Sequence, residues 1–206
     1  MIRHPRGLRE PSVTPPKPRA SRVQAVVLGA SLGGPRALAQ ILREFPPSFP
    51  LPIALVQHMA EGFTSAFTRW LAQELRLNVV EAEQGMRLEG GTVYVAPGDR
   101  HLRLRNGRVH LGDDEPQHGF RPSVSALFRS VAENYGSRAL GVILTGMGTD
   151  GSDGLWELRK SGAMTIAQDE ASSAVFGMPR AAIELGAAER VLPLGAIAEA
   201  IQEAAR

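Results

Sequence analysis

The chain contains no cysteine, which excludes disulfide bonds, cysteine-based zinc sites and a thiol nucleophile. Aromatic residues are scarce, at 5% of the sequence, and only two of them are tyrosines. No apolar run approaches the roughly 18–20 residues that a membrane-spanning helix needs. The N-terminus is basic but lacks the apolar segment of a secretory signal. These absences predict a cytoplasmic protein without membrane insertion.

The 206 residues are enough for one α/β domain with its own core, and 43% of them are hydrophobic. Residues 1–22 differ from the rest, because they hold six basic residues, one acidic residue and five prolines. Such a segment cannot bury enough apolar surface to fold. It also has no aromatic residue to stack on bases, which argues against a nucleic-acid partner. We therefore expect a disordered tail at 1–22 and one folded domain at 23–206.

Short apolar runs typical of strands alternate with helical patterns after the tail. Strands are expected at 24–28, 52–57, 78–81, 92–96, 140–145, 163–168 and 190–192, and helices at 35–44, 62–75, 122–134, 152–161, 178–185 and 194–204. The continuous apolar run at 53–56 is typical of a parallel sheet covered on both faces. Alternation around Asn106-Gly107 predicts one antiparallel hairpin at 101–111 with a type I′ turn. The fold class is therefore α/β: a doubly wound, mostly parallel sheet with helices on both faces and one antiparallel β-hairpin.

Residues 24–35 are the most informative stretch, because an apolar strand pattern meets a glycine-rich turn and then a proline-started helix pattern. Gly29, Ser31 and Gly33 fit G-x-S-x-G, the pattern of a nucleophile elbow. The free N–H groups of the following helix could hold an oxyanion nearby. Two other interpretations stay open: a loop that binds a phosphate or dinucleotide, and a serine that only caps the helix.

In open α/β sheets, sites form beyond the carboxyl ends of the strands. Ser31, His58, Asp150 and Asp169 all follow predicted strands. His58 is the one histidine of five that directly follows a buried strand, and histidine suits the role of the base that activates a serine. Asp150 and Asp169 compete for the role of the acid that orients the imidazole. Asp150 could instead cap the helix that begins near Ser152, and Asp169 could be an ordinary loop acid.

The sequence argues against two other enzyme families, one of oxidoreductases and one of hydrolases. Short-chain dehydrogenases need a Tyr-x-x-x-Lys pair, but glycine and alanine stand four residues after Tyr94 and Tyr135. The α/β-hydrolases order their triad as serine, acid, histidine, whereas the order here is serine, histidine, acid.

Several separated motifs together resemble one known family. They are Gly-Ala-Ser-Leu-Gly-Gly-Pro at 29–35, Val-Gln-His-Met at 56–59, Val-Tyr-Val-Ala-Pro-Gly at 93–98, Arg-Pro-Ser-Val at 121–124, Leu-Thr-Gly-Met-Gly-Thr-Asp-Gly at 144–151, Gln-Asp-Glu at 168–170 and Phe-Gly-Met-Pro at 176–179. In this order and spacing they look like the catalytic domain of the chemotaxis-type protein-glutamate methylesterases, the CheB-like family.

The resemblance implies a serine hydrolase that removes methyl esters from glutamate side chains of chemoreceptors and deamidates certain receptor glutamines. It places the catalytic roles on Ser31, His58 and Asp150, and it decides for Asp150 over the competing acid. It also implies that the N–H of Met147, with that of Leu32, holds the oxyanion. Leu32 stands where the family often has threonine. No metal or cofactor is implied.

The resemblance also predicts partners, namely the cytoplasmic helices of methyl-accepting chemoreceptors. Well-known members carry an N-terminal phospho-acceptor receiver domain, and residues 1–22 are too short for one. A separate phospho-receiver protein is therefore the expected source of any phosphorylation control. The alternative function, from another class, is a non-catalytic α/β module that grips a phosphate or another anion with the turn at Ser31.

Overall fold

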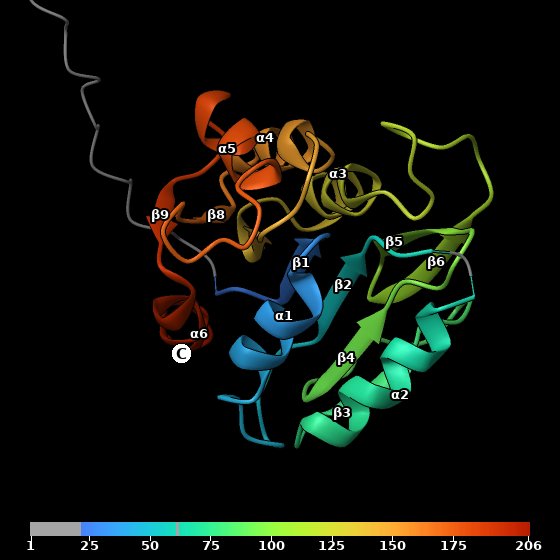
Figure 1. Ribbon diagram of the computed structural model, residues 1–206. Coiled ribbons are helices and arrows are strands. Elements are labelled where there is room, and N and C mark those ends of the chain that lie inside the picture. Colours follow the sequence, from blue (N-terminus) through green and yellow to red (C-terminus); the bar gives the residue numbers. More distant parts are fainter. Residues whose placement is uncertain (1–21, 61) are drawn as a thin grey trace, which may run out of the picture.

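The computed structural model describes residues 22–60 and 62–206 (Figure 1). Of the expected tail, only Arg22 belongs to the described residues, and its guanidinium donates a hydrogen bond to the Ala205 carbonyl at 3.2 Å. The rest of that prediction lies outside them. Within the described residues, no helix is long and apolar enough to span a membrane.

The main sheet is built from the strands β1 (Ala25–Ala30), β2 (Ile53–Gln57), β3 (Asn78–Glu81), β4 (Thr92–Val95), β7 (Ala139–Ile143), β8 (Met164–Gln168) and β9 (Arg190–Leu192). A separate hairpin consists of β5 (His101–Arg105) and β6 (Arg108–Gly112). The helices are α1 (Gly34–Leu42), α2 (Thr64–Glu74), α3 (Val124–Tyr135), α4 (Ser152–Lys160), α5 (Met178–Glu184) and α6 (Leu194–Ala204), with a short 3₁₀ turn η1 (Gly136–Arg138).

In the described part of the chain, the strands of the main sheet follow the order β3-β4-β2-β1-β7-β8-β9, and every neighbouring pair is parallel. The chain places β2, β3 and β4 on one side of β1 and then β7, β8 and β9 on the other. The point between β1 and β7 is therefore the topological switch point, where α/β proteins form their sites. The predicted doubly wound fold is confirmed.

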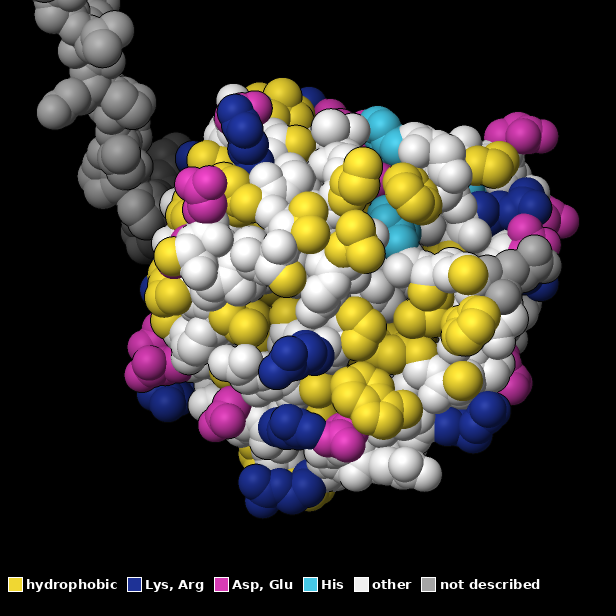
Figure 2. Space-filling model, viewed as in Figure 1, with side chains coloured by type: hydrophobic (Ala, Val, Ile, Leu, Met, Phe, Trp, Pro, Cys, Tyr) yellow, Lys and Arg dark blue, Asp and Glu magenta, His cyan; other side chains and the backbone are white. Residues whose placement is uncertain are grey.

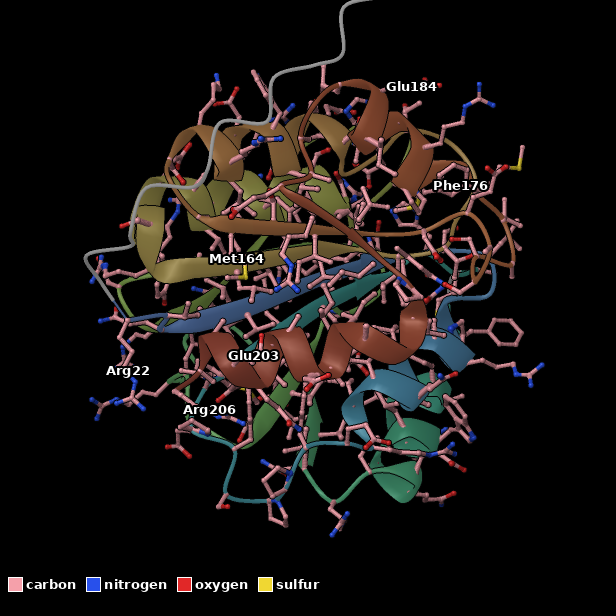
Figure 3. The ribbon with its side chains drawn as sticks, turned by 90° about the vertical axis from the view of Figure 1, so that its left-hand side faces the viewer. Arg22, Met164, Phe176, Glu184, Glu203 and Arg206 are labelled. Carbon is pink, nitrogen blue, oxygen red and sulfur yellow. The ribbon has the colours of Figure 1, made fainter. Side chains whose placement is uncertain are left out.

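Helices cover both faces of this sheet and bury its apolar strands. One core cluster joins the sheet to α1, α2 and α6, and the second joins it to α3, α4 and α5. Figure 3 views the sheet from its β9 edge, with α6 (Glu203) on one face and α5 (Glu184) on the other. Burial on both faces explains why the strands are continuously apolar rather than alternating.

The predicted hairpin and most element bounds agree with the structure. Asn106 and Gly107 have φ of 49° and 70°, and a type I′ turn requires positive φ at both central positions. The helix expected to begin at Pro122 begins instead at Val124. Ser123 is extended there, and its hydroxyl accepts a hydrogen bond from the Ala126 N–H at 3.3 Å, so it is the N-cap.

Candidate active site

Ser31 directly follows β1, and two glycines shape the backbone around it. Gly33 has φ of 81° and caps α1, which begins with a proline in its first turn. Gly146 packs against the serine, since a Cβ atom on Gly146 would lie 2.8 Å from the Cβ of Ser31. Side chains at these two positions would strain the turn or displace Ser31, so the glycines keep this serine at the end of β1.

His58 lies beside Ser31 because β1 and β2 are parallel neighbours. Ala30 pairs with Gln57, so the next residue on each strand stands side by side, and the His58 N–H donates to the Ala30 carbonyl at 2.9 Å. The side-chain amide of Gln57 donates to the carbonyls of Ser31 and His58, both at 2.8 Å. Gln57 thereby ties the two backbones together. Neither the spacing nor the composition of the sequence indicated this role.

Asp150 contacts the imidazole of His58 and is itself 1% exposed. The Nε2 atom of His58 lies 2.8 Å from Oδ2 of Asp150. Because an ionised carboxylate only accepts hydrogen bonds, Nε2 carries the proton, and Nδ1 is then the acceptor of the neutral ring. Nδ1 is buried without a hydrogen-bond partner, and the Ser31 hydroxyl makes no hydrogen bond within the described residues either.

The N-terminus of α3 holds the carboxylate of Asp150. Oδ1 accepts from the Ser123 hydroxyl at 2.7 Å and from the Ser125 N–H at 3.1 Å, and Oδ2 accepts from the Val124 N–H at 2.7 Å. Burial by itself would raise the pKa of Asp150, but hydrogen bonds from His58, Ser123 and Val124, and the charge of His58 when its ring is protonated, lower it below its ordinary value. The carboxylate is therefore held ionised at a helix N-terminus, where negative charge is favoured.

The competing acid, Asp169, serves a different purpose. Its Oδ1 accepts from the N–H and the hydroxyl of Ser172, at 3.0 Å and 2.5 Å, and closes the turn after β8. Asp150 does not cap α4 as considered above, because the N-cap position there is Gly151. Of the two acids, Asp150 is the one that the structure brings to His58.

The peptide between Ser31 and Leu32 is fixed through its carbonyl. That oxygen accepts from the Gln57 side chain and from the Gly34 N–H, both at 2.8 Å. In a planar trans peptide the C=O and the N–H point in opposite directions. The Leu32 N–H is therefore aimed away from both donors by the fold itself.

The peptide between Gly146 and Met147 is fixed in the same way. Its carbonyl accepts from the Gly177 N–H at 3.0 Å and from the Met178 N–H at 2.9 Å, at the start of α5. The Met147 N–H is thus directed away from α5. Neither this N–H nor that of Leu32 donates a hydrogen bond to another described residue. Two oriented, unused donors therefore lie in the two turns that flank Ser31.

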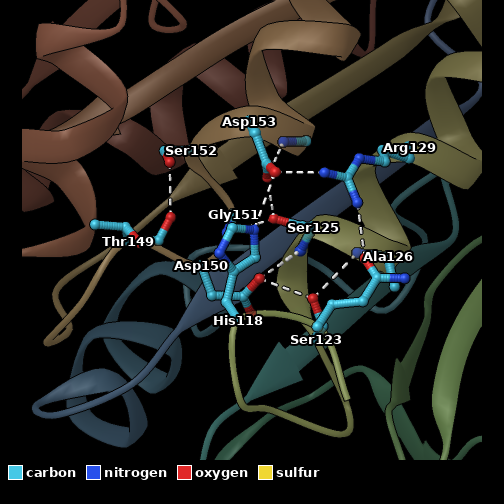
Figure 4. A network of polar contacts seen from close by, with 12 residues as sticks. His118, Ser123, Ser125, Ala126, Arg129, Thr149, Asp150, Gly151, Ser152 and Asp153 are labelled. Atoms are coloured by element: carbon cyan, nitrogen blue, oxygen red, sulfur yellow. Dashed lines mark hydrogen bonds and ion pairs between the residues drawn. The ribbon is translucent and has the colours of Figure 1, made fainter. Parts of the chain in front are cut away.

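A second polar cluster adjoins Asp150 and was not expected from the sequence (Figure 4). The Ser125 hydroxyl donates to Asp153 and accepts from the Gly151 N–H at 2.8 Å. Asp153 also pairs with Arg129 and with His118, whose Nε2 lies 3.0 Å from Oδ2. Burial would raise the pKa of Asp153, but the hydrogen bonds from Ser125 and His118 and the charge of Arg129 lower it. The cluster braces the loop that carries Asp150.

Apolar side chains surround the site on the outer surface. Leu32, Met147 and Phe63 are 54%, 65% and 62% exposed. A groove of about 470 Å³ lies next to the site, lined by Pro35, Met59, Ala60, Phe63, Ala66, Phe67 and Trp70. Figure 2 shows the hydrophobic side chains gathered on this face beside histidine. Within residues 22–60 and 62–206, no cluster of three potential metal-ligating side chains accompanies them.

The fold and the site define a doubly wound α/β protein in which a paired histidine and aspartate lie next to the serine that follows β1, at the switch point. Residues 26–201 match the family described as CheB methylesterase. The chain therefore belongs to the CheB methylesterase family, as the resemblance of its motifs predicted.

Two curated relatives match almost the whole chain. The "protein-glutamate methylesterase/protein-glutamine glutaminase 2" of Anaeromyxobacter dehalogenans is 57% identical over 100% of this chain and 60% of its own length. The "protein-glutamate methylesterase FrzG" of Myxococcus xanthus is 49% identical over 97% of this chain and 58% of its own length. The chain thus spans about three fifths of these relatives. The crystal structure of the CheB methylesterase catalytic domain of Thermotoga maritima superposes with a TM-score of 0.84 at 42% identity, covering 89% of this chain and 99% of that one.

Proposed function

We propose that this chain is a serine hydrolase that removes methyl esters from glutamate side chains of methyl-accepting chemoreceptors. The names of both relatives support the activity. The observation that carries the proposal is the state of His58, which stands next to Ser31 in the sheet: one ring nitrogen is bonded to the buried carboxylate of Asp150, and the other has no hydrogen-bond partner. That is the arrangement a general base needs.

In the first half of the reaction, Ser31 is the nucleophile. Its Oγ attacks the γ-carbonyl carbon of the glutamyl methyl ester while Nδ1 of His58 takes the hydroxyl proton. The bond between the γ-carbon and the methoxy oxygen then breaks, and the same proton passes from Nδ1 to that oxygen, which departs as methanol. Asp150 keeps the proton on Nε2 and stabilises the imidazolium. In the serine-protease triad, Nε2 of the histidine faces the serine and Nδ1 faces the aspartate. Here the two nitrogens have the opposite roles, because Nε2 is bonded to Asp150.

In the second half, water hydrolyses the acyl-enzyme. Nδ1 of His58 takes a proton from the attacking water and returns it to Oγ of Ser31, which releases a glutamate carboxylate. Both halves pass through a tetrahedral oxyanion. The N–H groups of Leu32 and Met147 hold that charge, since both are unused and fixed by the carbonyls of their own peptides. A glutamine side chain fits the same steps with ammonia as the leaving group, so we propose glutaminase activity as well.

The partners follow from the same proposal. The cytoplasmic helices of chemoreceptors present the ester, and the exposed apolar residues around the site provide contact surface for them. A cytoplasmic location and control by a separate phospho-receiver protein are part of this proposal. The alternative, a non-catalytic anion-binding module, gives the paired His58 and Asp150 no purpose, because an anion-binding turn needs only its free N–H groups.

The test is the release of labelled methanol from membranes whose chemoreceptors carry labelled methyl groups. We expect Ser31→Ala to lower this release by a factor of about 10⁴–10⁶, the range found for triad serines. Ser65→Ala is the matched control, since its hydroxyl lies on exposed α2 and donates to Glu81 at 2.6 Å. A folded Ser31→Ala protein that keeps more than about a tenth of the wild-type rate would overturn the proposal.

A further inference from the structure

Phe120 lies in the connection between β6 and α3, and its ring stacks on the imidazole of His58. The two ring centroids are 3.8 Å apart, and the ring planes differ by 3°. We propose that Phe120 is a positioning residue that holds the imidazole plane and thereby the position of Nδ1, the atom that takes the proton of Ser31. The proposal rests on the proposed function, because it assigns Nδ1 the task of taking the serine proton.

The imidazole needs such a support because its hydrogen bonding is one-sided. Nε2 is bonded to Asp150, while Nδ1 has no partner. The bond to Cβ and a single hydrogen bond at Nε2 still leave the ring plane free to rotate about the line that joins these two points. A parallel ring against its face removes this freedom. The side chain of His58 is only 4% exposed, so the stacked ring also excludes water from that face.

The backbone holds Phe120 in place through a small hairpin. The N–H of Gln117 donates to the Phe120 carbonyl at 3.0 Å, and the N–H of Phe120 donates to the Gln117 carbonyl at 2.9 Å. His118 and Gly119 form the tip, with φ of 51° and 81°, the left-handed values that a tight two-residue turn requires. Phe120 therefore projects from a closed turn rather than from an open loop.

Side-chain contacts fasten this turn to α3 and α4. Nε2 of His118 lies 3.0 Å from Oδ2 of Asp153, and Nη1 of Arg129 donates to the Gln117 side chain at 2.8 Å. Arg129 also pairs with Asp153, as Figure 4 shows. Asp153 lies one turn beyond Asp150, so the segment that brings the carboxylate to one edge of the imidazole also anchors the turn that covers its face.

Arg121, the residue after Phe120, fixes the C-terminal end of the small hairpin. Nε and Nη2 of Arg121 donate to Oδ1 of Asp99 at 2.9 Å and 2.6 Å, and Nη1 donates to the Asp113 carbonyl at 2.9 Å. The connection is therefore bonded at both ends of the small hairpin. Such over-determined placement is what a group that orients a catalytic side chain requires.

The decisive experiment measures how fast a small serine-directed fluorophosphonate inactivates the protein, because this reagent needs no receptor docking. We expect Phe120→Ala to slow inactivation by about tenfold, the factor that corresponds to a stacked pair worth about 1.4 kcal/mol. Phe120→Tyr keeps the ring and should restore the rate. In methanol release, the alanine variant should lower kcat by a similar factor and leave KM unchanged.

Leu185→Ala is the control, because Leu185 is a large hydrophobic side chain, 46% exposed at the end of α5, and belongs neither to the proposed triad nor to the groove beside it. Its inactivation rate should equal that of the wild type. The proposal is overturned if Phe120→Ala reacts within about twofold of the wild type, or if Phe120→Tyr is as slow as Phe120→Ala.

A wild-type protein that does not react with the phosphonate would contradict the proposed function instead. The imidazole ¹⁵N signals of His58 then decide the positioning role on their own. We expect one sharp tautomer, protonated at Nε2, in the wild type and in Phe120→Tyr, and an exchange-broadened or mixed tautomer in Phe120→Ala. Identical signals in all three proteins would overturn the inference.

Discussion

Replacing Asp150 by asparagine keeps the shape of the side chain but leaves it with one accepting oxygen. In the native protein, Oδ2 accepts from His58 and from the Val124 N–H, and Oδ1 accepts from the Ser123 hydroxyl and the Ser125 N–H. In either orientation, the new NH₂ group faces one of the two backbone N–H groups. A buried donor that loses its acceptor costs about 1–3 kcal/mol, and we expect the free energy of unfolding to fall by this amount.

The loss of activity should be much larger than the loss of stability. If the NH₂ group faces His58, it donates to Nε2 and moves the ring proton to Nδ1. That atom can then no longer accept the proton of Ser31. In the other orientation, the imidazolium loses its negative partner. We expect the rate of methanol release to fall by about 10⁴-fold, as for triad aspartates replaced by asparagine.

Asp169→Asn is the control, because it makes the same chemical change at the acid that closes the turn with Ser172. Its rate should stay within about twofold of the wild type. Methanol release and urea unfolding on both variants separate activity from stability. The reasoning is refuted if Asp169→Asn costs more activity than Asp150→Asn, or if folded Asp150→Asn keeps more than about a tenth of the rate.

Two further outcomes are expected. His58→Ala should be about as damaging as Ser31→Ala, and the double variant little worse, because residues that act as one unit are not additive; multiplied losses in methanol release would show that they act separately. The folded state lowers the pKa of Asp150 from its ordinary value of 3.8. The stabilising contribution of the carboxylate is therefore complete well above 3.8, begins to fall near that value, and is lost as pH falls through the lower pKa of the folded state. Urea unfolding between about pH 5 and about pH 3 should therefore show a steeper loss of stability in the wild type than in Asp150→Asn, and equal slopes would contradict this assignment.

The serine and the histidine of the site were predictable because their geometry follows from local rules. Each directly follows an apolar run, and parallel strands end at the same edge of a sheet. The glycines near Ser31 predicted a tight turn. In the structure, Gly33 has a left-handed backbone conformation, and Gly146 packs closely against Ser31. These signals lie within a few residues of the positions that they describe.

The choice between Asp150 and Asp169 was beyond local rules, because both follow predicted strands. The sheet order decides between them: β7 lies next to β1, whereas β8 is one strand further away. Neighbouring strands are about 4.8 Å apart, so the acid after β8 starts roughly 10 Å from the strand that carries the serine. Strand order depends on long-range packing, and in its absence only the family resemblance favoured Asp150.

The residues that orient the site could not be predicted from the sequence, because their contacts also depend on long-range packing. Gln57 points across to a neighbouring strand, and Phe120 reaches His58 from an irregular connection with no hydrophobic period. Neither contact can be inferred from the spacing or the composition of the sequence, because each joins two segments that are far apart along the chain. In the proposed mechanism, these contacts fix what the reacting atoms require: a carbonyl that aims the Leu32 N–H, and a ring that holds the imidazole plane. A sequence pattern can name the groups that react, while the precision of their placement comes from tertiary contacts around them.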